Sequence, residues 1–89
     1  MNNARRKQLL NLIPRIDELQ STISELQEAL EAIRDEEQEY LDNIPENLQG
    51  SEKYGKSEQA IESLDSAAYS LENMYDEVSD ILGNIDEAM

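Results

Sequence analysis

Cysteine, histidine, tryptophan and phenylalanine are all absent from this 89-residue chain. The chain therefore has no disulfide, no thiolate nucleophile and no imidazole base, and it lacks the usual zinc ligands. A chain of this length buries only a modest core, and a thin fold offers no enclosed pocket for a substrate. We expect a single domain that is not an enzyme and holds no cofactor.

Long hydrophobic runs are absent as well. Arg5, Arg6 and Lys7 resemble the basic start of a signal peptide, but the apolar stretch that follows is interrupted by polar residues and by Pro14. No run is long enough to cross a bilayer. We expect a soluble, cytoplasmic protein without membrane contact, whose basic residues either fray or reach an acidic face.

Basic residues are scarce. The chain has 21 acids and 7 bases, a formal net charge of -14, and no base between residues 57 and 89. Such a surface repels nucleic acid and attracts cationic proteins, so we expect no direct nucleic-acid binding. The acids lack the order of a calcium-binding loop, which favours a solvated surface over a metal site. This candidate acidic surface consists of Asp35, Glu36, Glu39, Asp42, Glu62, Asp76, Glu77 and Asp80.

The first half of the chain repeats an apolar residue at alternate steps of three and four. In the heptad notation abcdefg, the a column is Leu9, Ile16, Ile23 and Leu30, and the d column is Leu12, Leu19, Leu26 and Ile33. This coiled-coil pattern predicts a helix from about residue 4 to residue 43. Pro14 either lies in the first turn of that helix or kinks a helix that runs through it, and the unbroken heptad phase favours the second alternative.

The second half continues the pattern from Tyr54 to Met89 and predicts a helix over about 57–88. Its g column is also apolar or small, and consists of Ala60, Ala67, Met74, Ile81 and Ala88. A contact between two helices covers only the a and d columns, so this third column needs another cover. We therefore predict an all-α fold, an antiparallel two-helix coiled-coil hairpin that dimerises into a four-helix bundle.

Between the predicted helices, residues 44–56 contain Pro45, Gly50 and Gly55 and have no periodicity. Ser51 and Ser57 are both candidate N-caps for the second helix, and Gly55 weakens a helix that begins at the earlier one.

Matching the facing layers of the two helices gives a register. It pairs Glu37 with Ser57 and Ile23 with Leu71, and it brings Arg34 toward Glu58. A shift of one heptad sets the Glu37 carboxylate against an apolar residue, which is costly.

The four tyrosines divide between the seam and the surface. Tyr40, Tyr54 and Tyr75 fall at core columns, where we expect the rings to pack and the hydroxyls to reach water. Tyr69 falls at b, away from the seam, and is a candidate contact residue. The candidate interaction residues are therefore Ala60, Ala67, Tyr69, Met74, Ile81 and Ala88.

The stretch YLDNIPENLQGSEKYGKSEQAIESLDSA, residues 40–67, resembles a block in small uncharacterised proteins of bacteriophages, prophages and mobile elements of Gram-positive bacteria. In those proteins an acidic heptad helix precedes an "IPENLQGSE.Y" connector and a second acidic helix follows. The close resemblance covers about a third of the chain. Gly55 stands where the relatives often have an acid. The resemblance implies a phage origin but no particular activity.

Two functions fit these observations. The first is a protein-protein interaction module that forms a homodimer and binds another protein. The alternative is an acidic inhibitor whose carboxylates imitate the phosphates of DNA and occlude a cationic host protein, either a nucleic-acid-binding or a defence protein.

Overall fold

The first helix begins at a side-chain cap and follows the heptad pattern. In the computed structural model, which describes residues 1–89, α1 spans Asn3–Asp42. The Asn2 side-chain oxygen accepts a hydrogen bond from the Arg5 backbone N–H at 2.9 Å and so satisfies a donor that the helix leaves free. The basic N-terminal residues are therefore helical rather than frayed.

The second helix begins earlier than predicted. α2 spans Glu52–Ala88, and the Ser51 side-chain oxygen caps it by accepting from the Tyr54 N–H at 3.3 Å. The prediction of a start near residue 57 was wrong because Ser51, not Ser57, is the cap. Gly55 lies inside the helix, where a flexible residue lowers stability without breaking the hydrogen-bond ladder. The connector is shorter than predicted and contains one short 3-10 helix, η1, at Glu46–Leu48.

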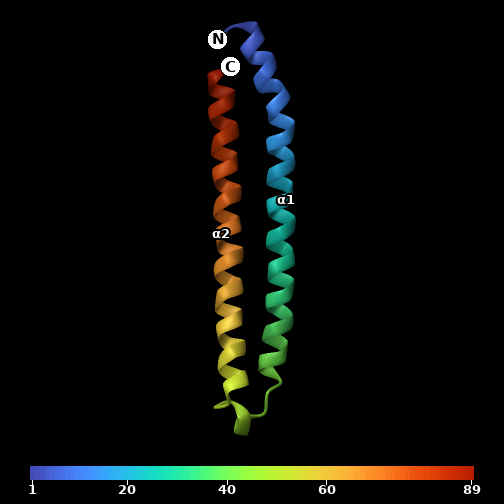
Figure 1. Cartoon of the computed structure of the whole chain (residues 1–89), viewed down its shortest axis with the longest axis vertical. Coiled ribbons are helices and arrows are strands. Elements are labelled where there is room, and N and C mark those ends of the chain that lie inside the picture. The colour runs from blue at the N-terminus through green and yellow to red at the C-terminus, as the bar shows by residue number, and fades with distance from the viewer.

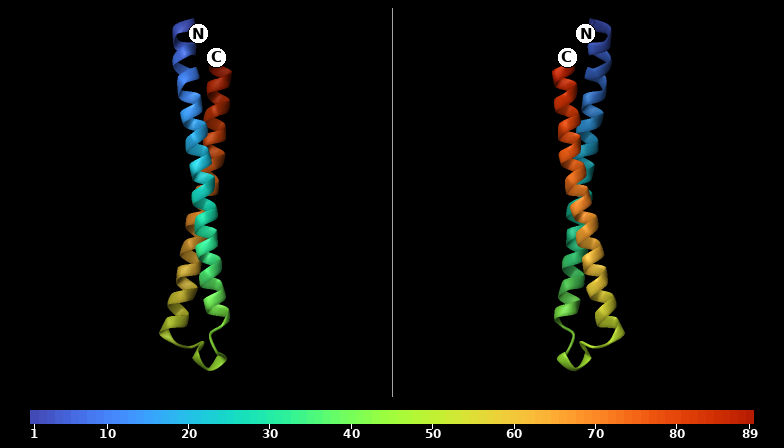
Figure 2. Two further views of the ribbon diagram at one scale, coloured as in Figure 1. Left: turned by 90° about the vertical axis from the view of Figure 1, so that its right-hand side faces the viewer. Right: turned by 90° about the vertical axis from the view of Figure 1, so that its left-hand side faces the viewer.

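The two long helices pack side by side and antiparallel, so both termini lie at one end and the connector at the other (Figure 1). The side views show that α1 and α2 cross as they run along each other (Figure 2). The hairpin measures 70 × 14 × 13 Å and its radius of gyration is 20.2 Å. A compact domain of this length would have a radius of about 12 Å. The prediction of an all-α helical hairpin is confirmed.

α1 continues through Pro14, as the unbroken heptad phase favoured. Pro14 is exposed and lies on the outer column, where the backbone carbonyl that it leaves unpaired can bind water. The N-terminal turns of α1 lean toward the end of α2 (Figure 1). There the Arg6 Nε donates a hydrogen bond to the Met89 carbonyl oxygen at 3.2 Å. Of the three basic residues, Arg6 thus contacts the end of the second helix, and none of the three pairs with an acid.

The register of the hairpin matches the prediction at its polar layer. Ser57, only 3% exposed, donates a hydrogen bond from its Oγ to the Glu37 Oε1 at 2.7 Å. Such a polar pair, with Ser57 buried and Glu37 half-buried, stabilises one alignment over slipped ones, because a slip takes the buried hydroxyl away from its partner. The buried apolar residues of the seam are Ile23, Leu41, Ala68 and Val78.

One part of the predicted seam was wrong. The d column of α1, which the heptad pattern assigned to the core, is exposed by 42% to 53%. Its members are Leu12, Leu19, Leu26, Ile33 and Tyr40. The e column packs on α2 in its place, and its members Ile13, Gln20, Gln27, Arg34 and Leu41 are all half-buried or buried. α1 is therefore rotated about its own axis, so that columns a and e face the partner helix.

Candidate interaction face

Polar contacts between the helices accompany the rotation of α1. Gln20 donates from Nε2 to the Ser79 Oγ at 2.6 Å and to the Tyr75 carbonyl oxygen at 3.1 Å. Further along, the Arg34 guanidinium pairs with Asp65 at 2.8 Å. Gln20, Ser79, Arg34 and Asp65 all occupy e columns, so the two e columns meet on one side of the seam. We call these four residues the polar side.

Arg34 does not bind Glu58, as the sequence-based register suggested, but an acid one heptad further along α2. It bonds Asp65 and also its neighbour Asp35, at 2.9 Å. The hydrogen bonds to Asp65 and then to Asp35 raise the pKa of the Arg34 guanidinium above its ordinary value. Arg34 is cationic at any physiological pH, as every arginine is, and its pair with Asp65 joins the e columns of the two helices.

The opposite side of the seam is apolar. On a helical wheel the e column lies beside a, whereas d and g lie on the other side of a. Since the e columns of both helices meet on the polar side, the d column of α1 and the g column of α2 share the other side. We call this surface the apolar face. It consists of Leu12, Leu19, Leu26, Ile33 and Tyr40 from α1, and Ala60, Ala67, Met74, Ile81 and Ala88 from α2.

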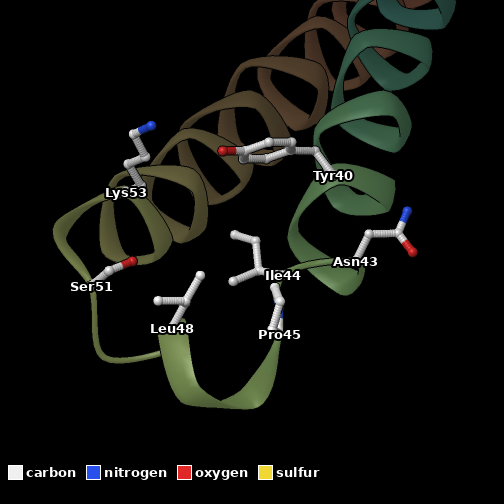
Figure 3. Close-up of a pocket in the computed structure, with 7 residues that line it drawn as sticks. All are labelled: Tyr40, Asn43, Ile44, Pro45, Leu48, Ser51 and Lys53. Atoms are coloured by element: carbon white, nitrogen blue, oxygen red, sulfur yellow. The ribbon is translucent and has the colours of Figure 1, made fainter.

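The connector end of the molecule confirms that these two columns share a face. Tyr40, from the d column of α1, and Lys53, from the g column of α2, line the same open pocket of about 320 Å³. Figure 3 shows both side chains above the aliphatic residues Ile44 and Leu48 of the connector. The pocket has an apolar floor and one cation at its rim.

Side chains on the apolar face are far from fully covered. Met74 and Ile81 are 46% and 47% exposed, and Ala67 and Ala88 are also exposed. Ala60 is half-buried. The heptad assignment placed the d column of α1 in the core and so missed its exposure. The e column could have indicated the rotation, because Ile13 and Leu41 are aliphatic and two further members are uncharged glutamines.

The tyrosines do not follow the predicted division. Tyr40 and Tyr75 are 51% and 39% exposed, so neither ring lies in the core, whereas Tyr54 is half-buried. Tyr69 is the most exposed of the large hydrophobic residues, as a residue away from the seam should be. It lies about 140° around α2 from Met74. Tyr69 is therefore not part of the apolar face.

The candidate acidic residues lie outside the seam, on columns b, c, f and g of the two helices. All eight, Asp35, Glu36, Glu39, Asp42, Glu62, Asp76, Glu77 and Asp80, face solvent. Asp35 is paired with Arg34, and Asp42 accepts a hydrogen bond from Gln38 at 2.9 Å. No group of three acids is arranged to hold a metal ion.

Comparison with protein-family models, with curated proteins and with solved structures found no match. Neither long helix contains a window apolar enough to cross a membrane.

Proposed function

We propose that this hairpin is a non-enzymatic interaction module that associates with a second copy of itself through the apolar face, forming a four-helix bundle. The proposal rests on the half-exposed d column of α1, which consists of Leu12, Leu19, Leu26, Ile33 and Tyr40. These apolar side chains repeat along the helix at heptad spacing, and only one side of each lies against α2. Monomeric soluble proteins rarely expose so long a row of apolar side chains to water.

The exposed area supports the same conclusion. The accessible surface of the hairpin is 6658 Å², whereas a folded monomer of this mass exposes roughly 5300 Å². Only 5 of the 89 residues are buried. Covering one half-exposed leucine contributes about 1 kcal/mol, so a row of such residues is enough to hold two hairpins together.

Analytical ultracentrifugation over a concentration series tests the proposal. We expect the wild-type mass to rise from one chain to two as the protein concentration reaches the high micromolar range. Leu19→Asn and Ile81→Asn place an amide in the new interface and should keep the chain monomeric, because an unpaired buried amide is costly. Ser66→Asn, on the outward column of α2, is the matched control. A wild-type mass of one chain at every concentration would refute self-association.

The acidic surface supports a second candidate function, an inhibitor encoded by a phage or mobile element that imitates the phosphate charge of DNA. Its carboxylates lie on both helices, and segment 57–89 adds no cation to offset them. Such a protein would occlude a cationic nucleic-acid-binding or defence protein of the host.

Pull-down from host lysate with a salt series separates the two candidates. Mimicry predicts basic partners that DNA or high salt displaces, and predicts that Asp76→Asn with Asp80→Asn weakens their capture. A partner that binds the apolar face resists salt and is lost instead in Leu19→Asn.

A further inference from the structure

The charges beside the apolar face distinguish the possible dimers. Two hairpins that pack through this face can place their connectors at the same end or at opposite ends. With connectors at the same end, α1 lies over α2 of the second copy. With connectors at opposite ends, each helix lies over its own copy.

The Glu37–Ser57 contact fixes which residues of the two helices lie at the same level along the hairpin. Counting along both helices from that contact places Arg15 level with residue 79, and places Glu36 and Glu39 level with residues 58 and 55. Each of these three residues has an oppositely charged residue two positions from its level on α2, a distance of about 3 Å along the axis. The pairs are Arg15 with Glu77, Glu36 with Lys56, and Glu39 with Lys53.

Arg15 and Glu36 lie on the g column of α1, beside its d column, and Glu39 lies one column further, at c. Lys53, Lys56 and Glu77 lie on the g and c columns of α2, and all six residues are exposed. None of the three pairs forms within the hairpin, where Lys56 instead makes one exposed contact with Glu52 at 3.1 Å. The side chains are thus free to reach a second copy, and an exposed contact within one helix competes only weakly.

We propose that the second copy packs on the apolar face with its connector at the same end, so that α1 of each chain lies over α2 of the other. Two-fold symmetry then forms each of the three charge pairs twice. In the half of the hairpin near the connector the arrangement also sets large side chains over small ones, because Leu26 lies over Ala67 and Ile33 over Ala60. This inference rests on the proposed self-association and adds its geometry.

The opposite arrangement lacks these advantages. It places α2 over α2, and the end that holds Lys53 and Lys56 then lies over the C-terminal end of its copy. The g and c columns there contain Ile81, Asn84 and Ala88, none of which is an acid. The leucine row of α1 would also face itself, large against large.

The absence of cysteine allows a direct distance measurement on the full chain. Gln49→Cys, in the connector, carries one spin label per chain. Connectors at the same end predict a separation between the two labels of less than half the 70 Å length of the hairpin. Connectors at opposite ends predict a separation near that full length. Ser21→Cys, on the outward column near the middle of α1, is the control, since its distance differs little between the two arrangements.

Charge exchange gives a second readout. Arg15→Glu and Glu77→Arg should each weaken dimerisation by about three- to tenfold, and the combination should restore it. Glu28→Arg, on the outward column, controls for net charge. A long connector distance in a dimer, or no rescue by the double variant, overturns the arrangement while leaving self-association intact. A mass of one chain at all concentrations overturns both.

Discussion

The two sides of the seam differ in how completely one chain satisfies them. On the polar side, Gln20 and Arg34 cross from α1 to bond Ser79 and Asp65 on α2. On the apolar face, Leu19 and Ile81 remain about half exposed. Two helices share a single seam, so a rotation of α1 that brings its e column onto α2 turns its d column toward solvent. We infer that the polar contacts hold α1 in the orientation that leaves its d column exposed.

The largest expected effect contrasts a residue inside the seam with one on the apolar face. Ile23→Ala removes a side chain that is 3% exposed and should lower the free energy of unfolding by about 2–5 kcal/mol. Leu26→Ala removes a side chain that is 51% exposed and should cost about 1 kcal/mol in dilute protein. Urea denaturation followed by circular dichroism measures both losses.

Protein concentration sharpens that contrast. Because a dimer stabilises the folded state by mass action, the cost of Leu26→Ala should grow with concentration, whereas the cost of Ile23→Ala should stay nearly constant. If Ile23→Ala does not fold, Ile23→Val, at about 0.5–1.5 kcal/mol, serves instead. Equal losses for both positions at every concentration would show that the two sites have the same surroundings.

The next effect concerns the polar layer inside the seam. Ser57→Ala leaves the Glu37 carboxylate without its partner and should lower the free energy of unfolding by about 1–3 kcal/mol. Ser66→Ala, at an exposed position of the same helix, should change stability by less than about 0.5 kcal/mol.

Replacing both partners separates stability from alignment. Ser57→Ala with Glu37→Leu should recover the lost stability, since two apolar residues need no hydrogen bond. The same variant should allow slipped pairings, which a label pair on α1 and α2 would reveal as more than one distance. A single sharp distance in the double variant would show that the apolar layers alone determine the register.

The helices and their register followed from the sequence because each rests on a local or repeated signal. The heptad steps predict both helices, and the Glu37–Ser57 layer predicts the alignment, since a slip is penalised. The predicted start of α2 was wrong because Ser51 and Ser57 are both suitable N-caps and Gly55 favoured the later one. The prediction of which side of α1 faces α2 was also wrong, because Gln20 and Arg34 of the e column bond across the seam where the heptad pattern expects the d column. A heptad pattern contains no information about such tertiary contacts.

The smallest expected effect tests whether the polar side orients α1 rather than stabilises it. A double-mutant cycle with Arg34→Met and Asp65→Ala should give a coupling of about 0.2–1 kcal/mol, which decreases in high salt because the pair is partly exposed. The double variant should nevertheless weaken dimerisation, since without its cation α1 can rotate and bring the leucine row back onto α2. The hydrogen-bonded pair Gln38 and Asp42, on columns b and f of α1 and away from the apolar face, is the control and should leave dimerisation unchanged. A coupling well above this range, with dimerisation intact, would mean that the polar side holds the hairpin together without determining which face it presents.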